Sequence, residues 1–213
     1  MKFYNKAFYF LTKWFFFTLL KIYNRLTVRR LGPLPAGNFI LIANHCSHLD
    51  PLVVGASIPG RLRFLAKAEL FEPLFLGTVL KLLGVVPVLK QDSQSAGATL
   101  RAFIKVLGEG ENVVIFPEGG RSPDGQLQPL EGGAALIALK SGAPVVPAFV
   151  AGTFEAMPTG VKMVKPLRLS VIIGKPIDTG EYVEMGKKGR EQLMERMSAE
   201  LASLESPARA LIG

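Results

Sequence analysis

Apolar and polar residues are arranged in two different patterns along most of the chain. Short runs that are apolar at nearly every position, such as residues 38–43 and 112–116, are separated by longer segments in which apolar residues recur every three or four positions. Strands covered by helices on both faces of a sheet have the first pattern, and amphipathic helices have the second. Their alternation predicts an α/β domain.

The same patterns place the individual elements. A loop rich in Pro and Gly is expected over residues 34–37. Beyond it, strands are expected over residues 39–43, 62–66, 85–89, 113–116, 145–150 and 167–173. Helices are expected over residues 51–57, 69–83, 94–107, 132–140 and 187–204. The chain has 213 residues, which is the length of one domain, and it contains no internal repeat.

The N-terminal segment differs from the rest of the chain in charge and in aromatic content. All seven charged residues before Asp50 are basic, whereas the chain from Asp50 onwards holds 18 basic and 17 acidic residues. Ten of the nineteen aromatic residues lie within the first 23 positions. On a helical wheel one side of this segment is largely apolar, with Tyr4, Ala7, Phe8, Leu11, Trp14, Phe15, Thr18, Leu19 and Ile22. The opposite side holds Lys6, Lys13, Lys21 and Asn24.

These features predict a basic amphipathic helix that lies in the headgroup layer of a membrane, where each basic residue contributes roughly 1 kcal/mol. We therefore divide the chain into a membrane-associated helix, residues 1–30, and the α/β domain, residues 31–213. Three alternatives compete. A spanning helix needs about 20 apolar residues, but Lys13 and Lys21 enclose only seven uncharged ones. A signal peptide needs an unbroken apolar region, and a core helix does not explain the missing acidic residues.

Charge and cysteine content exclude several classes of function. The net charge of +8 is concentrated in the N-terminal segment and not spread over the domain, so no binding of nucleic acid is expected. The single Cys46 cannot form an intrachain disulfide, and two histidines are too few for a typical zinc site. We expect no metal and no cofactor. A reducing environment and a basic helix together indicate a peripheral or monotopic protein on the cytoplasmic face of the cell membrane.

The first candidate chemical group follows the strand expected over residues 39–43. His45 stands at the end of this strand, and Asp50, followed by Pro51, stands where a helix is expected to begin. Asp is a favourable N-cap and Pro a favourable first helical residue. A tight loop allows the Asp50 carboxylate to reach one ring nitrogen of His45, which fixes the tautomer and stabilises the imidazolium. Taken alone, the spacing also fits a plain helix cap and a structural histidine.

The second candidate segment, Phe116-Pro-Glu-Gly-Gly-Arg-Ser122, also follows an apolar strand. Gly119 and Gly120 expose backbone N–H groups, and Arg121 carries a planar fork that suits bidentate binding of phosphate. An ordinary glycine-rich turn with a solvated arginine is the alternative. Ligands of open α/β sheets bind where strands end, so we expect this segment and His45 to belong to one site.

In combination, these segments resemble the 1-acylglycerol-3-phosphate acyltransferases and their glycerophosphate acyltransferase relatives. The resemblance covers roughly residues 30–180. The first block of that family matches Asn44, His45, Ser47 and Asp50, and its Phe-Pro-Glu-Gly-Thr-Arg-Ser block matches Phe116–Ser122 with Gly120 in the Thr position. Residues 67–70 with 84–88 resemble the intermediate block, and residues 146–147 with 152–153 the last one.

The resemblance implies a single domain with a mixed central sheet flanked by helices. It also implies transfer of a fatty acyl group from acyl-CoA or acyl carrier protein to a lysophospholipid, most simply 1-acylglycerol-3-phosphate. His45 and Asp50 are then catalytic, and substrate binding falls to Glu118, Gly119, Gly120, Arg121, Lys90 and Lys67. Glu118 either accepts from a substrate hydroxyl or pairs with Arg121. Membrane lipid and the thioester carrier are the expected partners.

Two departures from the family pattern bear on the acceptor. Lys90 stands where the family usually has an arginine, which keeps the charge and loses the fork. Glu131 precedes Gly132 where the family often has a lysine. The alternatives are therefore acyl transfer to another lyso-acceptor, or a non-catalytic lipid-binding membrane protein.

Two other chemistries are less well supported by the sequence. Cys46 or Ser47 as the nucleophile of a covalent hydrolase is one, but neighbouring side chains such as those of His45 and Cys46 usually diverge. A metal held by His45, His48 and Asp50 is the other, and it would rest on three ligands from one short loop.

Overall fold

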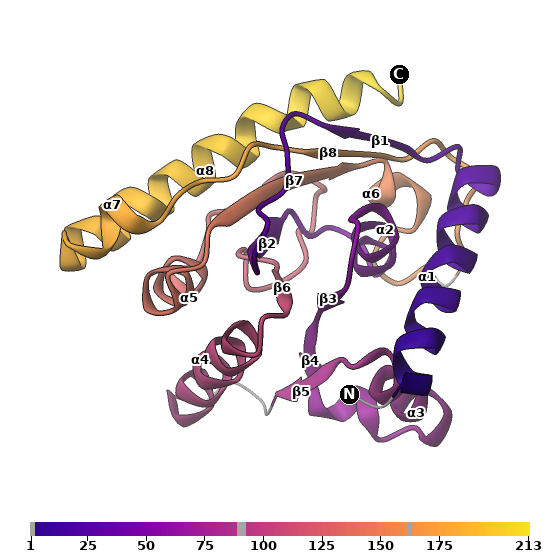
Figure 1. Ribbon diagram of the computed structural model, residues 1–213. Helices are drawn as coiled ribbons and strands as arrows, with labels where there is room; N and C mark the ends of the chain where they lie inside the picture. The colour runs from indigo at the N-terminus through magenta and orange to yellow at the C-terminus, as the bar shows by residue number, and fades with distance from the viewer. Residues whose placement is uncertain (1–2, 89–92, 162) are drawn as a thin grey trace.

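The computed structural model describes residues 3–88, 93–161 and 163–213, and its centre is a twisted sheet (Figure 1). The strand order is β1-β8-β7-β2-β6-β3, and every neighbouring pair is parallel except β7 and β8. These strands are β1 (Thr27–Arg30), β2 (Ile40–Ala43), β3 (Leu62–Arg63), β6 (Asn112–Ile115), β7 (Val145–Ala151) and β8 (Ser170–Ile173). A separate parallel pair consists of β4 (Leu65–Lys67) and β5 (Val86–Val88).

Helices cover both faces of this sheet, and each face has its own hydrophobic core. The helices are α1 (Phe3–Tyr23), α2 (Asp50–Ser57), η1 (Ala68–Phe71), α3 (Leu74–Leu83), α4 (Ser93–Gly108), α5 (Gly133–Ser141), α6 (Thr153–Ala156), α7 (Gly180–Val183) and α8 (Gly186–Ala210). One core joins α1 and α2 to the sheet, and the other joins α4, α5 and α8 to the opposite face. Strands β2 and β7 are buried at every position, as the uniformly apolar runs predict.

The predicted α/β domain with a mixed sheet is confirmed, and most expected elements lie within a few residues of their predicted positions. Two expected elements are each divided. The strand over residues 62–66 forms β3 and β4, which pair in different sheets. The helix over residues 69–83 forms η1 and α3, because Pro73 lacks an N–H and disfavours helical geometry at the residue before it. Leu89, at the end of another expected strand, lies outside the described residues.

Strand β1 is an element that the sequence pattern did not predict. Its sequence Thr-Val-Arg-Arg shows no alternation, and its last two residues are exposed. β1 pairs with β8 alone, at the edge of the sheet. The segment of residues 1–30 that we expected to lie on the membrane thus includes a strand of the central sheet.

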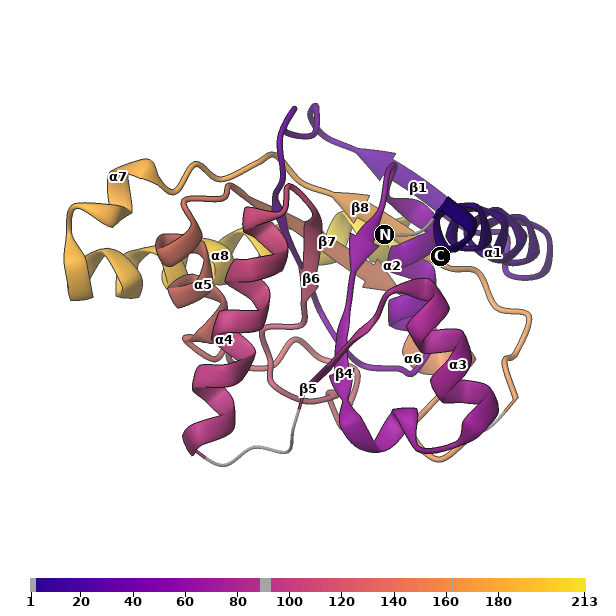
Figure 2. The ribbon, with the colours of Figure 1, turned by 60° about the horizontal axis from the view of Figure 1, so that its bottom comes forward.

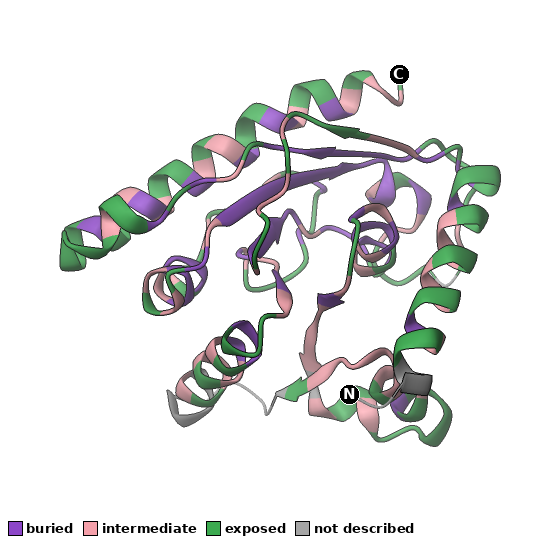
Figure 3. Ribbon diagram, in the orientation of Figure 1, coloured by how far each residue is buried: buried purple, intermediate pink, exposed green. Residues whose placement is uncertain are grey.

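Helix α1 packs against α2 and α3 along one side and exposes an apolar surface along the other (Figure 3). Leu11, Trp14, Phe15 and Ile22, all from the predicted apolar side, have between 62% and 76% of their surface exposed. Within the described residues, no helix has both the length and the apolar composition needed to cross a membrane.

The position expected for Lys13 is wrong. We expected its ammonium group near lipid phosphates, but Lys13 Nζ donates hydrogen bonds to the carbonyl of Ile58 and, at 2.7 Å, to that of Gly60. Burial lowers the pKa of Lys13 to about 8. The reason is that Tyr9 and Leu20, on the same side of α1, are buried against the domain and turn Lys13 inward with them.

Candidate active site

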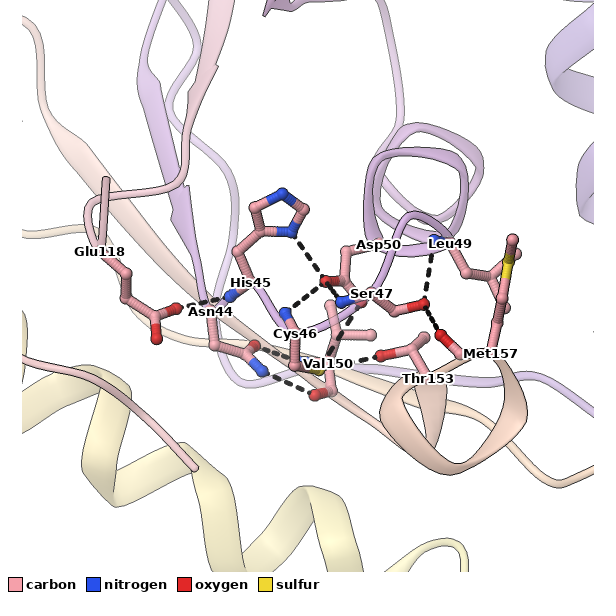
Figure 4. A network of polar contacts seen from close by, with 10 residues as sticks. All are labelled: Asn44, His45, Cys46, Ser47, Leu49, Asp50, Glu118, Val150, Thr153 and Met157. Carbon is pink, nitrogen blue, oxygen red and sulfur yellow. Dashed lines mark hydrogen bonds and ion pairs between the residues drawn. The ribbon is translucent and has the colours of Figure 1, made fainter. Parts of the chain in front are cut away.

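His45 and Asp50 lie within hydrogen-bond distance in the loop that joins β2 to α2 (Figure 4). His45 Nδ1 is 2.9 Å from Asp50 Oδ2, and the Asp50 side chain is fully buried. Because an ionised carboxylate only accepts, Nδ1 carries the proton in this pair and Nε2 keeps a free lone pair. The ring of His45 stacks on Phe116 with 4.2 Å between the ring centroids, which restricts its rotation. The expected contact between His45 and Asp50 is present.

The sequence favours Asp50 as the N-cap of the helix, but in the structure it does not cap α2. Asp50 is itself the first residue of α2, and Leu49 occupies the N-cap position. Besides His45, the carboxylate oxygen Oδ2 accepts the backbone N–H groups of Cys46 and Ser47, each at 2.7 Å. The side chain thus points back toward the loop and fastens the turn that carries His45. These donors offset the cost of burying a charged group.

The backbone of His45 joins the two candidate segments into one site. Strands β2 and β6 are parallel neighbours, with Ile42 opposite Ile115, so His45 and Glu118 each lie three residues beyond this pair. The N–H of His45 donates to Glu118 Oε1 at 2.5 Å, and the carbonyl of His45 accepts the N–H of Ser122 at 2.7 Å. The sequence expectation that these segments meet at one edge of the sheet therefore agrees with the structure.

Glu118 acts as a bridge between loops. Its second oxygen, Oε2, accepts the N–H of Gln128 at 2.8 Å, so each carboxylate oxygen holds one backbone N–H. Of the two alternatives for Glu118, the ion pair with Arg121 is not formed between these two described residues. Burial raises the pKa of the Glu118 carboxyl, and the N–H donors of Gln128 and His45 oppose part of that rise.

Replacing Glu118 with Gln should loosen this bridge. The amide has one oxygen, so one of the two backbone N–H groups would face an NH₂ group that cannot accept. We expect the free energy of unfolding to fall by about 1–3 kcal/mol, the cost of an unsatisfied buried donor. Urea denaturation of the wild type and the variant measures this change, and an unchanged unfolding midpoint would show that Glu118 does not hold the loops.

The same pair of proteins tests the raised pKa of Glu118. A carboxyl whose pKa is raised in the folded state favours folding while it is protonated. Its contribution is therefore present below its ordinary pKa of 4.5 and is lost as the pH rises through the folded value. Gln does not titrate. The stability advantage of the wild type over Glu118→Gln should therefore shrink as the pH rises from 4.5, and a difference that grows over this range would contradict the assignment.

Arg121 extends from the glycine turn toward the cavity beside His45. Its side chain is exposed and makes no hydrogen bond or ion pair with any described residue. Gly119 has φ +70°, a conformation that favours glycine, and a Cβ atom at this position would lie 2.1 Å from Glu131 Oε1. Glu131 therefore packs against Gly119, while a side chain at Gly120 would meet open space. The arrangement leaves a guanidinium and a glycine backbone facing the cavity.

Two of the predicted binding residues are not covered by this description of the site. Lys67 is the last residue of β4, and its side chain lies outside the described part of the structure. Lys90 lies outside the described residues. The two remain predictions from the sequence.

A cavity of about 790 Å³ begins at this site and extends into the protein. Its polar end contains His45, His48, Gly119, Gly120 and Arg121. The rest of the wall is mostly apolar and comes from α1, α2, α3, β4, β6 and α4, with Phe16, Leu52, Phe64, Leu80, Leu83 and Phe103 among its residues. A mostly apolar cavity that also contains basic and other polar groups suits an amphiphilic ligand.

Two residues near the site have functions that spacing in the sequence did not reveal. Asn44 exchanges two hydrogen bonds with the backbone of Val150, at 2.9 Å and 2.7 Å, and so ties the end of β2 to β7. His48 lies beside Arg121 and His45 in the cavity wall, and burial and these two neighbours lower its pKa. The signals for Asn44 in the sequence were its position directly before His45 and its match to the first family block.

The environment of Cys46 does not suit a nucleophile. The thiol is buried beside Thr153, with Sγ 3.4 Å from Thr153 Oγ1, and burial raises its pKa to about 12. Ser47 Oγ donates to the carbonyl of Met157 at 2.7 Å, which directs the hydroxyl away from His45. Among the described residues, His, Cys, Asp and Glu side chains form no group of three that is arranged to hold a metal ion.

Comparison with known proteins gives consistent matches. A 1-acyl-sn-glycerol-3-phosphate acyltransferase from Bacillus subtilis is 31% identical over 191 residues, which is 88% of this chain and 88% of the relative. A chloroplastic enzyme of the same name from Brassica napus is 34% identical over 160 residues, 75% of this chain and 46% of the relative. This chain spans about half the length of the chloroplastic relatives that it matches.

A solved structure agrees with these sequences. The 1-acyl-sn-glycerophosphate (LPA) acyltransferase PlsC from Thermotoga maritima superposes with a TM-score of 0.75 at 25% sequence identity, covering 95% of this chain and 80% of that one. The family model described as Acyltransferase matches residues 25–151, which contain the histidine loop, the arginine turn and the strands that bring them together. With the fold, the order of the motifs and the geometry in agreement, the chain belongs to the acyltransferase family.

Proposed function

We propose that this protein transfers a fatty acyl group from a thioester to the free hydroxyl of 1-acylglycerol-3-phosphate, giving phosphatidic acid. One observation carries the proposal: the backbone of His45 ties its loop to the arginine turn, so that a His45–Asp50 pair and Arg121 face the same apolar cavity. The names of the relatives from Bacillus subtilis and Thermotoga maritima support this substrate.

The reaction divides into two steps at this site. His45 Nε2 takes the proton of the acceptor hydroxyl as its oxygen attacks the thioester carbonyl, and Asp50 stabilises the imidazolium through Nδ1. The tetrahedral intermediate then collapses, the carbon–sulfur bond breaks, and the departing thiolate receives the proton from His45. Backbone N–H groups at Gly119 and Gly120 are the available donors for either the oxyanion or the phosphate.

The reaction also requires that the acceptor hydroxyl is placed next to His45, and this function belongs to Arg121. Its guanidinium is exposed and without a partner among the described residues, so it is free to bind a phosphate in bidentate fashion. Binding the phosphate at a fixed distance from His45 converts remote binding energy into correct orientation of the reacting hydroxyl. The apolar cavity accommodates an acyl chain and keeps water from the thioester.

The membrane is the expected source of the lipid acceptor. The exposed apolar side of α1, with Leu11, Trp14 and Phe15, suits the acyl region of a bilayer, while Lys6 and Arg25 are exposed at its two ends. We place the protein peripherally or monotopically on the cytoplasmic face of the membrane, with acyl-CoA or acyl carrier protein as donor. Residues 1–30 then provide attachment and residues 31–213 provide catalysis.

One observation favours a second class of acceptor. The Glu131 carboxylate lies against Gly119 of the proposed phosphate-binding turn. A negative charge at this position weakens the binding of a phosphate monoester and favours a lysophospholipid whose headgroup carries an amine or a hydroxyl beyond the phosphate. The second candidate is therefore acyl transfer to such a lysophospholipid at the same site.

A panel of acceptors tests the proposed function. Purified protein is incubated with an acyl-CoA or an acyl carrier protein thioester and with 1-acylglycerol-3-phosphate, lysophosphatidylglycerol, lysophosphatidylethanolamine or lysophosphatidylcholine. Mass spectrometry identifies the product. We expect phosphatidic acid to form fastest. Faster acylation of another lysophospholipid would support the second candidate, and thiol release with no acylated product would overturn both.

A further inference from the structure

Two elements that enclose the cavity also carry exposed apolar side chains on their outer surfaces. From α1, Tyr9 and Phe16 line the cavity, while Leu11 and Phe15 face outward. From the segment of η1 and α3, Leu70 and Leu80 line the cavity. Helices α1 and α3 pack against each other (Figures 1 and 2). The cavity wall is thus continuous with an exposed apolar surface on both elements.

The first turn of α3 exposes the two most accessible large apolar side chains of the described residues. Leu74 has 88% of its surface exposed and Phe75 has 84%. Both are more exposed than any residue of the apolar side of α1, where the highest value is 76% at Ile22. Pro73 is the N-cap of α3, directly before this turn. An aromatic and an aliphatic residue at the end of a projecting turn would lose contact with water on entering lipid.

The position of this turn indicates a bilayer as the surface that covers it. The α3 turn belongs to a segment that lines the cavity, and the lipid acceptor must pass from a membrane into that cavity. The adjacent α1 carries the exposed apolar surface, and every charged residue before Asp50 is basic, which suits the anionic headgroups of a cytoplasmic leaflet. A protein partner would not explain why the apolar surface continues into the site for an acyl chain.

We propose that the first turn of α3, through Leu74 and Phe75, inserts into the bilayer beside α1, and that lipid enters the cavity laterally between these two helices. This inference rests on the proposed function. In this arrangement the acyl chain moves from the bilayer to the cavity without crossing water. The membrane contact therefore has two parts, α1 for attachment and the α3 turn for delivery of the acceptor.

Fluorescence tests the insertion directly, because the chain contains one tryptophan. In the double variant Trp14→Phe/Phe75→Trp, the only tryptophan lies on the α3 turn. Vesicles of phosphatidylcholine and phosphatidylglycerol with brominated acyl chains should shift its emission to shorter wavelength and quench it. Unchanged emission from protein that sediments with the vesicles would overturn the proposal. A shift that depends on protein concentration without vesicles would also overturn it, since a second copy would then cover the turn.

Activity tests the delivery of lipid. Leu74→Ser/Phe75→Ser should lower the rate on long-chain 1-acylglycerol-3-phosphate embedded in vesicles by on the order of tenfold or more, and leave the rate on a dissolved short-chain acceptor unchanged. The matched control is Val183→Ser/Met185→Ser, in and beside α7, which removes two apolar side chains that are exposed by 48% and 47% far from α3. We expect the control to act on both acceptors like the wild type.

The outcomes separate this inference from the proposed function. Equal loss on embedded and dissolved acceptors in Leu74→Ser/Phe75→Ser, or an unchanged rate on vesicles, would overturn lateral delivery while the proposed function stands. If the wild type acylates neither acceptor, the proposed function fails, and the fluorescence measurement still decides whether the α3 turn enters the bilayer.

Discussion

His45→Ala should reduce the turnover of acyl transfer by about 10² to 10⁴-fold, the usual contribution of a positioned general base. Asp50 Oδ2, at 2.9 Å from Nδ1, fixes which ring nitrogen can accept the hydroxyl proton, and no other described side chain offers the same combination of a basic nitrogen and a buried carboxylate. The Michaelis constant for the acceptor should change little, because phosphate binding is assigned to Arg121. Acceptor-dependent thiol release, followed by spectrophotometry, measures both constants.

His48→Ala is the matched control for this prediction. His48 lies three residues further along the same loop and also lines the cavity, but it makes no hydrogen bond with a carboxylate among the described residues. Its removal should lower turnover far less than the removal of His45. Circular dichroism should match the wild type in both variants, which shows that the loss of turnover is not a loss of the fold. If His45→Ala keeps wild-type turnover, or if His48→Ala causes the larger loss, His45 is not the base.

Arg121→Ala should mainly weaken the use of the acceptor. Loss of one partner from a hydrogen-bonded charge pair costs about 2–5 kcal/mol. Because Arg121 is exposed before the acceptor binds, we expect a value near the lower end, about 2 kcal/mol, or roughly 30-fold in kcat/KM. The change should appear in the Michaelis constant of the acceptor and not in that of the thioester. Steady-state kinetics with each substrate varied in turn measures this.

Arg121→Lys separates charge from geometry at the same position. Lysine keeps the positive charge and loses the planar fork that binds two phosphate oxygens. Its kcat/KM should therefore lie between those of the wild type and Arg121→Ala. If the alanine variant retains wild-type kcat/KM on 1-acylglycerol-3-phosphate, phosphate binding does not depend on Arg121.

The strands that carry the site were predictable because a strand buried on both faces of a sheet is a continuous run of apolar residues. β2 and β6 are apolar at almost every position, and the polar loops begin where those runs stop. The pairing of these strands in register then brings His45 to Glu118. The edge strand β1 has one neighbour and two exposed arginines, so nothing in its pattern distinguishes it from a loop.

The directions of individual side chains were less predictable, because they depend on contacts between distant segments. The sequence left Glu118 to contact either the substrate or Arg121, and it did not predict that each of its oxygens accepts a backbone N–H group from a different loop. Lys13 was expected at the lipid surface, but α1 is apolar on more than one side, and the side that contains Tyr9 and Leu20 packs on the domain. A helical wheel shows which residues share a side and not which side meets the protein.

In the proposed mechanism, His45 activates the hydroxyl of the acceptor and Arg121 holds its phosphate. The most direct test of this mechanism is the ratio of kcat/KM for 1-acylglycerol-3-phosphate to that for 1-acylglycerol, which lacks the phosphate, in the wild type, His45→Ala and Arg121→Ala. The ratio should stay at the wild-type value in His45→Ala, since both acceptors need the base, and fall roughly 30-fold in Arg121→Ala. A ratio that is unchanged in Arg121→Ala, or that falls equally in both variants, would contradict the account.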